Sequence, residues 1–389
     1  GLEIPLLVRT FAAFGRRSTS ELLGKVMAID YFGSLVASLV FPLVLLPQLG
    51  LMRGAYLGGA LNVLVAVLVL LQVRTPRKIL WAPTAAVGAL VGMFAAANRI
   101  ERSVEALTYN DPVVYYQQTA YQKVVLTDYQ DDLRMYLNGQ LQFSSLDEAR
   151  YHETLSASAM TSVKDPAHVL VLGGGDGLLA REILRYPSVK DVTIVDIDPG
   201  VTELARSNRL LKDLNKASLS DSRVNVVNDD AFTYVRDSRA TYDVVLVDLV
   251  DPSNEKLAKL YSTEFYRNVE ARLAPEGVMV TQATSTFFSP HAFSTVASTV
   301  ATSQPDRQIL PFSTNIPSFG EWGFVLSTRT PQNLISQPLP EGLTYQDRET
   351  LEFIMRTKPA RTETMEPSTL LHPRIVEVYN RDMRQWRYY

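Results

Sequence analysis

The alternation of hydrophobic and polar positions divides this chain of 389 residues into an apolar first quarter and a mixed remainder. Three apolar segments follow one another almost without charge, at residues 26–49, 55–73 and 79–97. Each has about the 20 residues with which an α-helix crosses a bilayer, and their small residues allow close helix packing in lipid. We predict a transmembrane helical domain over residues 1–98, anchored in membrane lipid. Because the chain enters an apolar stretch directly at Gly1, we expect its native N-terminus to lie further upstream.

A second pattern, of period two, begins after the apolar quarter. Apolar and polar residues alternate as far as Ser145, and Asn138-Gly139 is a strong signal for a hairpin turn. We predict a small antiparallel β-hairpin unit over residues 110–145. The following stretch, SSLDEARYHETLSASAM, has a helical pattern with Ser144 or Ser145 as its N-cap.

A third pattern alternates short apolar runs with helical segments. We expect strands at residues 168–172, 192–196, 224–228, 243–248, 277–282, 308–312 and 322–328. Strands that alternate with helices form mainly parallel, doubly wound sheets. We predict an α/β domain over residues 146–330 and a C-terminal tail over residues 331–389 that packs on this domain as short helices.

The stretch HVLVLGGGDGLLAREIL has the form of a strand, a tight turn and a helix. Gly173, Gly175 and Gly177 in its turn let a ligand approach the backbone, because they have no Cβ. The next predicted strand ends about 20 residues later at Asp196, where nucleotide-binding βαβ units place an acid for ribose hydroxyls. We therefore predict a Rossmann-like nucleotide-binding unit.

Acidic residues follow three successive predicted strands at their carboxyl ends. Asp176 lies in the glycine-rich turn, and the others are Asp196, Asp229, Asp230, Asp248 and Asp251. Ligands of open α/β sheets bind just outside these strand ends. Such a ring of acids suits a ligand with hydroxyls, an exocyclic amine and a positive charge, which favours S-adenosylmethionine or its decarboxylated form over a dinucleotide. Each acid taken alone could instead cap a helix or lie in a solvated turn.

Composition narrows the chemistry further. The chain has no cysteine, four histidines and a formal net charge of -3. These counts exclude disulfides, thiolate zinc sites and a thiol nucleophile, and they leave little for a histidine cluster, so we predict no metal. The balanced charge gives no electrostatic basis for binding nucleic acid.

The acids after the strand at residues 243–248 suit the activation of an amine. A primary amine is an ammonium ion at neutral pH and must lose a proton before it can attack carbon. We predict Asp248 as the general base, with Asp251 nearby for the acceptor amine. A sulfonium carbon is already activated by its charge, so the protein needs mainly to align the reacting groups.

The motifs GGGDG, VDID, NDDAF and VDLVDP, preceded by YLNGQLQFSSLDEARYHE, resemble the spermidine synthase (polyamine aminopropyltransferase) family. The apolar first quarter and the tail are similar to its membrane-attached members. The resemblance implies a methyltransferase-type Rossmann-like fold preceded by a small β unit, and a homodimer. It also implies decarboxylated S-adenosylmethionine as co-substrate and methylthioadenosine as product.

The same resemblance implies a role for each site residue. Asp176 would hold the aminopropyl amine, and Asp196, where the family commonly has Glu, would bind the ribose hydroxyls. The other implied contacts are those of Gln122 with the adenosyl ligand, of Asp229 and Asp230 with adenine, and of Tyr151 and His152 with the passage to the amine substrate.

Two departures from the family concern the acceptor site. An IPTY-like motif of the family supplies a tyrosine hydroxyl to the acceptor amine, whereas Phe319 in IPSF has none to offer. The segment after the predicted base usually has DP followed by GP in the family. Here it is DPSNEKLAKLY, with Lys256 and Lys259, and we expect both lysines to face solvent.

We therefore predict a membrane-attached transferase that moves an aminopropyl group from decarboxylated S-adenosylmethionine to an amine, with putrescine as the expected acceptor and spermidine as the product. An S-adenosylmethionine-dependent methyltransferase is an alternative, because a fold does not determine a function. A polyamine- or nucleoside-binding sensor or transport partner is a third interpretation, in which the membrane segment is the working part.

The charge pattern leaves the orientation in the inner or plasma membrane open. The positive-inside rule places two basic clusters in the cytoplasm, namely Arg16, Arg17 and Lys25, and Arg74, Arg77 and Lys78. A full third crossing would then put the catalytic domain on the opposite face, whereas a substrate made in the cytosol favours a cytoplasmic domain. We expect the two acids of this region, Glu3 and Asp30, to lie at headgroup level.

Overall fold

A computed structural model describes residues 19–72, 81–329, 334–360 and 362–386 of the chain. The chain divides into two compact units, residues 1–110 and 111–389, and each is described by itself below. Gly1, Glu3 and most of the basic residues used for the orientation argument lie outside the described residues.

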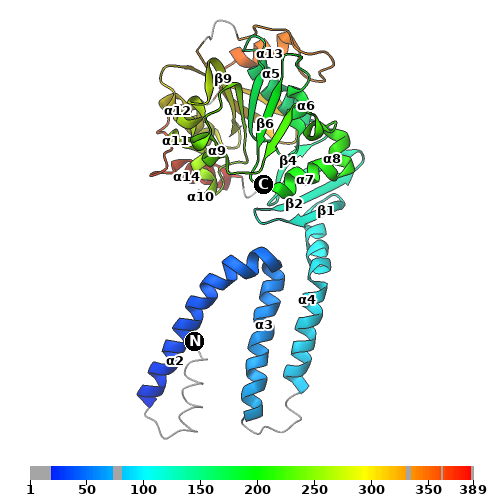
Figure 1. Ribbon diagram of the computed structural model, residues 1–389, viewed down its shortest axis with the longest axis vertical. Coiled ribbons are helices and arrows are strands. Elements are labelled where there is room, and N and C mark those ends of the chain that lie inside the picture. Colours follow the sequence, from blue (N-terminus) through cyan, green and yellow to red (C-terminus); the bar gives the residue numbers. More distant parts are fainter. Residues whose placement is uncertain (1–18, 73–80, 330–333, 361, 387–389) are drawn as a thin grey trace. The chain divides into compact units, whose positions relative to one another are not determined.

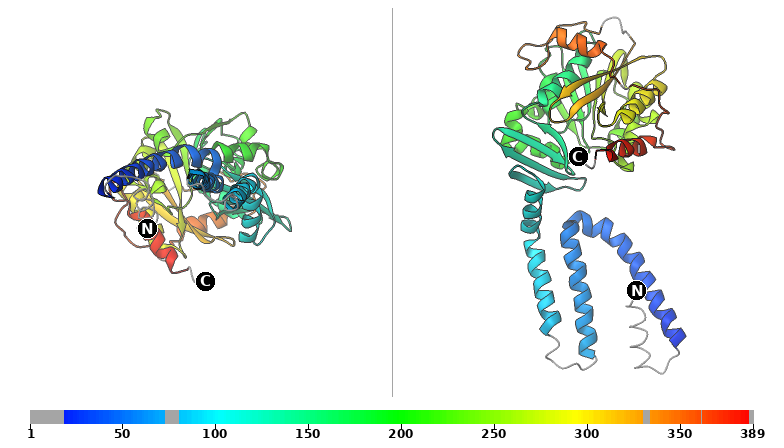
Figure 2. Two further views of the ribbon diagram at one scale, coloured as in Figure 1. Left: turned by 90° about the horizontal axis from the view of Figure 1, so that it is seen from below. Right: turned by 180° about the vertical axis from the view of Figure 1, so that it is seen from behind.

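The N-terminal unit is helical in its described part. Its elements are α2 (Thr19–Val40), the π-helical turn η1 (Phe41–Leu45), α3 (Leu46–Gln72) and α4 (Trp81–Thr108). The helix widens into η1 at Pro42, a residue that cannot donate a backbone hydrogen bond. Helices α3 and α4 run side by side (Figures 1 and 2), and a Cβ on Gly59 would lie 3.4 Å from Leu90, so a small residue permits the close approach.

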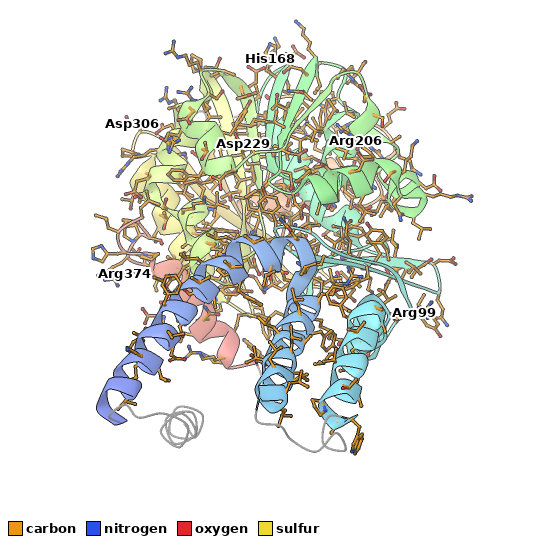
Figure 3. The ribbon with its side chains drawn as sticks, turned by 60° about the horizontal axis from the view of Figure 1, so that its bottom comes forward. Arg99, His168, Arg206, Asp229, Asp306 and Arg374 are labelled. Atoms are coloured by element: carbon orange, nitrogen blue, oxygen red, sulfur yellow. The ribbon has the colours of Figure 1, made fainter. Side chains whose placement is uncertain are left out.

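The described helices of this unit carry apolar side chains on their outer surface. Leu35 is 59% and Leu61 is 61% exposed, and the sticks along α2 and α3 in Figure 3 are almost all carbon. One stretch, Leu23–Leu45, is long and apolar enough to cross a membrane, with a mean hydropathy of 1.8. The apolar parts of the other two helices are shorter, at Met52–Leu68 and Trp81–Ala97, whereas the sequence pattern predicted three spans.

The C-terminal unit begins with a four-stranded antiparallel sheet. Its strands follow in the order β1 (Val113–Gln118), β2 (Lys123–Tyr129), β3 (Asp132–Leu137) and β4 (Gln140–Ser144). Asn138 and Gly139 both have positive φ, 53° and 83°, as the predicted two-residue hairpin turn requires. One face of this sheet buries Leu126 and Phe143 in an apolar cluster with Leu178 and Leu204 of the following domain.

A seven-stranded sheet forms the centre of this unit, in the order β10-β11-β9-β8-β5-β6-β7. The strands are β5 (His168–Gly173), β6 (Asp191–Val195), β7 (Val224–Val227), β8 (Tyr242–Asp248), β9 (Leu273–Ser285), β10 (Gln308–Ile316) and β11 (Gly320–Thr328). Strands β5 to β9 are parallel, and β10 and β11 are antiparallel to their neighbours. The predicted fold class, an α/β doubly wound sheet preceded by an antiparallel β unit, is confirmed.

Helices cover both faces of this sheet (Figure 1). Those that the structure describes are α5 (Glu148–Met160), α6 (Leu178–Ile183), α7 (Pro199–Ser207), α8 (Arg209–Leu214), η3 (Ser218–Ser220), α9 (Ala231–Asp237), α10 (Glu255–Ala258), η4 (Lys259–Tyr261), α11 (Thr263–Glu270), α12 (Pro290–Ser303), α13 (Arg348–Arg356) and α14 (Arg374–Arg384). Alternate residues of β5 point to opposite faces. Val171 packs in the apolar cluster of α5, α6 and α13, and Leu172 in that of α9, α11, α12 and α14.

The topology of the sheet determines where a ligand can bind. After β5 the chain adds β6 and β7 on one side, and then returns to add β8 and β9 on the other. The reversal leaves a crevice outside the carboxyl ends of β5 and β8, which is the usual ligand position in open α/β sheets.

The start of α5 differs from the prediction. The helix begins at Glu148, after Asp147, rather than near Ser144 or Ser145. Ser144 ends β4 instead, and its hydroxyl donates to Asp132 at 2.6 Å. The carboxylate of Asp147 accepts hydrogen bonds from the backbone N–H (2.6 Å) and the hydroxyl (2.8 Å) of Ser318, so it ties the start of α5 to the β10–β11 turn.

Candidate active site

A cavity of about 880 Å³ opens at the carboxyl ends of the central strands. Its wall combines the small β sheet, the glycine-rich turn, the loop after β8, the β10–β11 turn and α14. All but two of the predicted site residues line it, namely Gln122, Tyr151, His152, Gly173, Gly175, Asp176, Asp196, Asp230, Asp248, Asp251 and Phe319. Gly177 and Asp229 do not.

At each of the three glycine positions of this turn, a side chain would clash with a neighbouring residue. Gly173 has φ +90°, and a Cβ there would lie 1.9 Å from the backbone oxygen of Asp248. A Cβ on Gly175 would lie 2.5 Å from the carboxylate of Asp196. Gly177, with φ +80°, precedes α6 and is crowded by Ser218, so it shapes the turn without reaching the cavity. The turn therefore brings its backbone against the backbone of Asp248 and the carboxylate of Asp196.

Two carboxylates lie around this turn. Asp196 follows β6 and accepts hydrogen bonds from the backbone N–H groups of Gly175 (3.1 Å) and Asp198 (2.9 Å). Burial raises the pKa of Asp196 to about 6 in spite of these bonds. Asp176 accepts from the backbone N–H of Leu178 at 2.9 Å, and burial raises its pKa as well.

Asp198 is a residue that the sequence reasoning overlooked. Its carboxylate caps α7 by accepting from Gly200, at 2.9 Å, and accepts from the hydroxyl of Thr119 (2.7 Å) and the amide of Gln122 (3.1 Å). It thereby holds the β1–β2 turn, and Gln122 with it, against the central sheet. The signal was present in VDIDPG, because an Asp before a Pro is a common helix start.

The two neighbouring acids after β7 have different positions. Asp229 is exposed and accepts a hydrogen bond from the backbone of Asp230 at 2.7 Å. Asp230 lines the cavity, caps α9 through Thr233, and forms an ion pair with Lys259 at 2.5 Å. Lys259 and Lys256 both line the cavity. Lys256 is exposed, as expected, and Lys259 is partly exposed while it pairs with Asp230.

Asp248 is the last residue of β8 and lies at the centre of the crevice. The hydroxyl of Tyr151, on α5, donates to its Oδ1 at 2.6 Å. Burial raises the pKa of Asp248 to about 6, although the positive charge of His152 and the hydrogen bond from Tyr151 favour its ionised form. Asp248 is thus a carboxylate at neutral pH that accepts a proton more readily than an exposed Asp.

His152, next to Tyr151 on α5, is held as a cation. Burial disfavours its charge, but the hydrogen bond and the negative charge of Glu148 outweigh burial and raise the pKa of His152 to about 9. Its Nδ1 lies 2.8 Å from the Glu148 carboxylate, which also pairs with Arg181 at 2.9 Å. The sequence reasoning identified His152 but neither of these partners, of which Glu148 lies one turn earlier on α5 and Arg181 lies on α6.

Asp251 lies three residues after Asp248 and has a partner from the far end of the chain. The hydroxyl of Tyr379, on α14, donates to its Oδ2 at 2.9 Å. Burial raises the pKa of Asp251 to about 6 against this hydrogen bond. Its Oδ1 is buried and accepts no hydrogen bond from the described residues. The sequence reasoning did not connect the tail with the cavity.

Aromatic rings form the wall between these acids and the β10–β11 turn. Phe319 contacts Tyr151 edge to face, with ring centres 6.5 Å apart, and Trp322 at 5.3 Å. The cavity therefore has an acidic floor and an aromatic wall, which is an environment for a small cation with apolar segments. Among the described residues, no group of three or more His, Cys, Asp or Glu side chains could hold a metal ion.

A protein-family model described as the spermine/spermidine synthase domain matches residues 148–337. The chain is 37% identical over 394 residues to a polyamine aminopropyltransferase of Oceanobacillus iheyensis, covering 98% of this chain and 76% of that protein. It is 39% identical over 405 residues to polyamine aminopropyltransferase 1 of Streptomyces coelicolor, covering all of this chain and 75% of that protein.

Solved structures share the fold. A crystal structure of spermidine synthase in complex with the transition-state analogue AdoDATO has a TM-score of 0.59 and 24% identity, and covers 63% of this chain and 85% of its own. The spermidine synthase from Thermotoga maritima has a TM-score of 0.56 and 23% identity, and covers 63% of this chain and 84% of its own.

Proposed function

This chain belongs to the polyamine aminopropyltransferase (spermine/spermidine synthase) family and is a transferase, and we propose that it moves the aminopropyl group of decarboxylated S-adenosylmethionine to putrescine. The products are spermidine and methylthioadenosine. One observation carries the proposal: Asp176, Asp196, Asp248 and Asp251 converge on one cavity at the topological reversal of the sheet. Four carboxylates in one partly apolar cavity favour substrates with positive charge.

The donor substrate fits the side of the cavity at the glycine-rich turn. Asp196 has a position suited to ribose hydroxyls, as acids after the second strand of such units have. Asp230, at the start of α9, and Gln122, from the small sheet, suit the adenine and adenosyl parts. Asp176 suits the primary ammonium of the aminopropyl chain, since it lines the cavity and its carboxylate accepts a hydrogen bond from the backbone N–H of Leu178.

The acceptor substrate then lies between Asp248 and Asp251. The ammonium near Asp248 loses a proton to this carboxylate, and the neutral nitrogen attacks the aminopropyl carbon attached to sulfur. A nitrogen–carbon bond forms, the carbon–sulfur bond breaks, and its electron pair neutralises the sulfonium as methylthioadenosine leaves. Tyr151 orients the carboxylate through its hydrogen bond, at 2.6 Å. Asp251 suits the second ammonium of the diamine.

Two observations favour attachment to a membrane. Leu23–Leu45 has the length and hydropathy of a membrane span, and the large apolar side chains around it are exposed. We propose that residues 1–98 anchor the enzyme in the inner or plasma membrane with the catalytic domain, residues 146–330, in the cytoplasm. Membrane lipid is then a partner, and a homodimer stays a prediction from the resemblance.

Methylthioadenosine release tests the proposed reaction. The detergent-purified full chain receives decarboxylated S-adenosylmethionine with putrescine, cadaverine, spermidine or no amine, and ordinary S-adenosylmethionine serves as the control donor. We expect release that requires both the decarboxylated donor and an amine, and that is fastest with putrescine. Amine-independent binding of an adenosyl ligand without release contradicts the proposal. Methyl transfer from the ordinary donor alone, seen as release of S-adenosylhomocysteine, also contradicts it and would indicate a methyltransferase.

A further inference from the structure

The C-terminal helix α14 packs on the catalytic domain, although it lies beyond the residues matched by the family model. Asp382, 2% exposed, accepts hydrogen bonds from the backbone N–H groups of His291 (2.9 Å) and Ala292 (3.1 Å) at the start of α12. Ile375 and Val378 are buried in the apolar cluster on this face of the sheet. The helix is therefore a constant part of the domain and not a loose tail.

This packing places α14 against the loop that carries Asp251. The amide of Asn380 donates to the backbone oxygen of Ser253 at 3.2 Å, and the hydroxyl of Tyr379 donates to Oδ2 of Asp251 at 2.9 Å. Tyr379 and Met383, one turn later, both line the cavity. The tail helix thus closes the cavity at the end where Asp251 lies.

The hydrogen bond from Tyr379 determines which oxygen of Asp251 is left for a ligand. The hydroxyl of Tyr379 donates to Oδ2 at 2.9 Å, and the nearby amide of Gln282, which donates to Tyr261 and Leu249, also favours the ionised form of Asp251. Oδ1 is buried and unpartnered, so it can accept from an ammonium. The phenol remains protonated at neutral pH and can only hold Oδ2 in place.

This arrangement gives the cavity a tyrosine hydroxyl on α14, in addition to that of Tyr151. Phe319 has no hydroxyl to offer at the acceptor end, and its ring packs between Tyr151 and Trp322. Tyr379 supplies a hydroxyl to the same cavity, from an element that follows the matched domain. It reaches the carboxylate rather than the substrate, so its effect on the acceptor passes through Asp251.

We propose that Tyr379 is a positioning residue for the acceptor amine, which fixes Asp251 so that its free oxygen binds the distal ammonium of a linear diamine. This inference rests on the proposed function, because it concerns the amine end of the same cavity. It adds that a determinant of acceptor recognition lies in the C-terminal helix.

The test is Tyr379→Phe in the detergent-purified full chain, with Tyr266→Phe as the matched control. Tyr266 is a fully buried tyrosine of α11 that does not line the cavity. Loss of a hydrogen bond to a charged group is worth roughly a tenfold change in affinity. We expect the KM and the calorimetric Kd for putrescine to rise about tenfold in Tyr379→Phe, with kcat and the donor KM nearly unchanged. Tyr266→Phe should match the wild type in all four.

A double-mutant comparison separates positioning from a general structural role. In an Asp251→Asn background, Tyr379→Phe should add no further loss of putrescine affinity, because the two residues act through one contact. Equal putrescine affinity in Tyr379→Phe and wild type overturns the inference. A Tyr379→Phe variant in which kcat and the melting temperature fall and the donor KM rises along with the putrescine KM overturns it as well, because such changes indicate a general structural role. A wild type that binds putrescine more tightly than Tyr379→Phe but releases no methylthioadenosine would contradict the proposed reaction and leave this inference standing. A wild type that binds no amine overturns both.

Discussion

Burial controls the proton affinity of the carboxylates in the cavity. It raises the pKa values of Asp196, Asp248 and Asp251 to about 6 each. Each is ionised at neutral pH, yet holds a proton more strongly than an ordinary Asp. The free protein thus keeps several poorly solvated negative charges close together, and a cationic substrate relieves the cost of that arrangement. The same property makes Asp248 suitable as a proton acceptor.

The hydrogen bond from Tyr151 predicts the pH dependence of the reaction. An Asp must be ionised to act as a base, so kcat/KM for the amine should fall as the pH drops through about 6 in the wild type. The Tyr151 hydroxyl favours the ionised form of Asp248, so Tyr151→Phe should raise its pKa and shift the acid limb upward by about one pH unit. Methylthioadenosine release from pH 5 to 8.5 measures both profiles. An acid limb that stays in place in Tyr151→Phe would disprove the coupling.

Single residues also show which parts of the site could be predicted from the sequence. The acids at the strand ends were recognisable, because parallel strands bring their carboxyl ends to one edge. The choice between Asp229 and Asp230 was not, since a one-residue step in a loop turns one side chain to solvent and the other to the cavity. The ion pair of Lys259 with Asp230 was not predicted either, because it depends on how two separate loops meet.

At the scale of elements, the glycine-rich turn links β5 to α6 and places its backbone against the backbone of Asp248 and the carboxylate of Asp196. Gly173 pairs with Asp248 across neighbouring strands, while Gly175 faces the side chain of Asp196. The first contact is with backbone, which cannot move away, and the second is with the end of a side chain, which can.

This difference predicts unlike effects of two similar substitutions. Gly173→Ala combines positive φ with a Cβ only 1.9 Å from a backbone oxygen, and should lower the free energy of unfolding by at least about 2 kcal/mol. Gly175→Ala should keep the fold and displace Asp196, raising the donor KM roughly tenfold with little change in the amine KM. Chemical denaturation and steady-state kinetics test the pair. The account is wrong if the two variants lose stability equally.

The elements of the central sheet were predictable from the sequence, but some element boundaries and some contacts between distant elements were not. The alternation of short apolar runs with helical segments located the seven strands, because each strand is a short apolar run bounded by turn residues. The start of α5 was missed because Ser144 bonds to Asp132, twelve residues earlier in the chain, rather than to its own helix. Helix α14 has an amphipathic pattern, but no pattern states which distant loop its Tyr379 will meet.

At the scale of the whole molecule, the chain combines an apolar helical unit with an α/β unit that carries the whole cavity. The described residues that line the cavity all belong to residues 111–389. The chemistry should therefore not depend on the helical unit, whose exposed apolar side chains suit lipid.

Removal of residues 1–108 tests whether the reaction is independent of the helical unit. The shortened protein should stay in solution without detergent and keep kcat within about threefold of the full chain, because domains with their own core fold alone. Sedimentation with and without detergent, followed by the release assay, checks both points and also reports whether the protein is a dimer. A folded but inactive fragment would show that the helical unit contributes to catalysis.

The composition of the first quarter predicted an apolar helical region, but not its exact spans. The pattern indicated three crossings, whereas one described stretch, Leu23–Leu45, has the required length and hydropathy. The helices extend beyond their apolar parts, as α4 does to Thr108, because backbone hydrogen bonding continues where hydrophobicity ends.

The most direct test of the central claim is the rate of amine-dependent methylthioadenosine release by Asp248→Asn at saturating decarboxylated S-adenosylmethionine and putrescine. Asp306→Asn, at an exposed position before β10 (Figure 3), is the matched control. A general base contributes roughly 100-fold or more, so we predict a loss of at least that size in Asp248→Asn, with donor affinity retained and Asp306→Asn unchanged. An Asp248→Asn enzyme as fast as the wild type would contradict the account, because the amine would then lose its proton without this carboxylate.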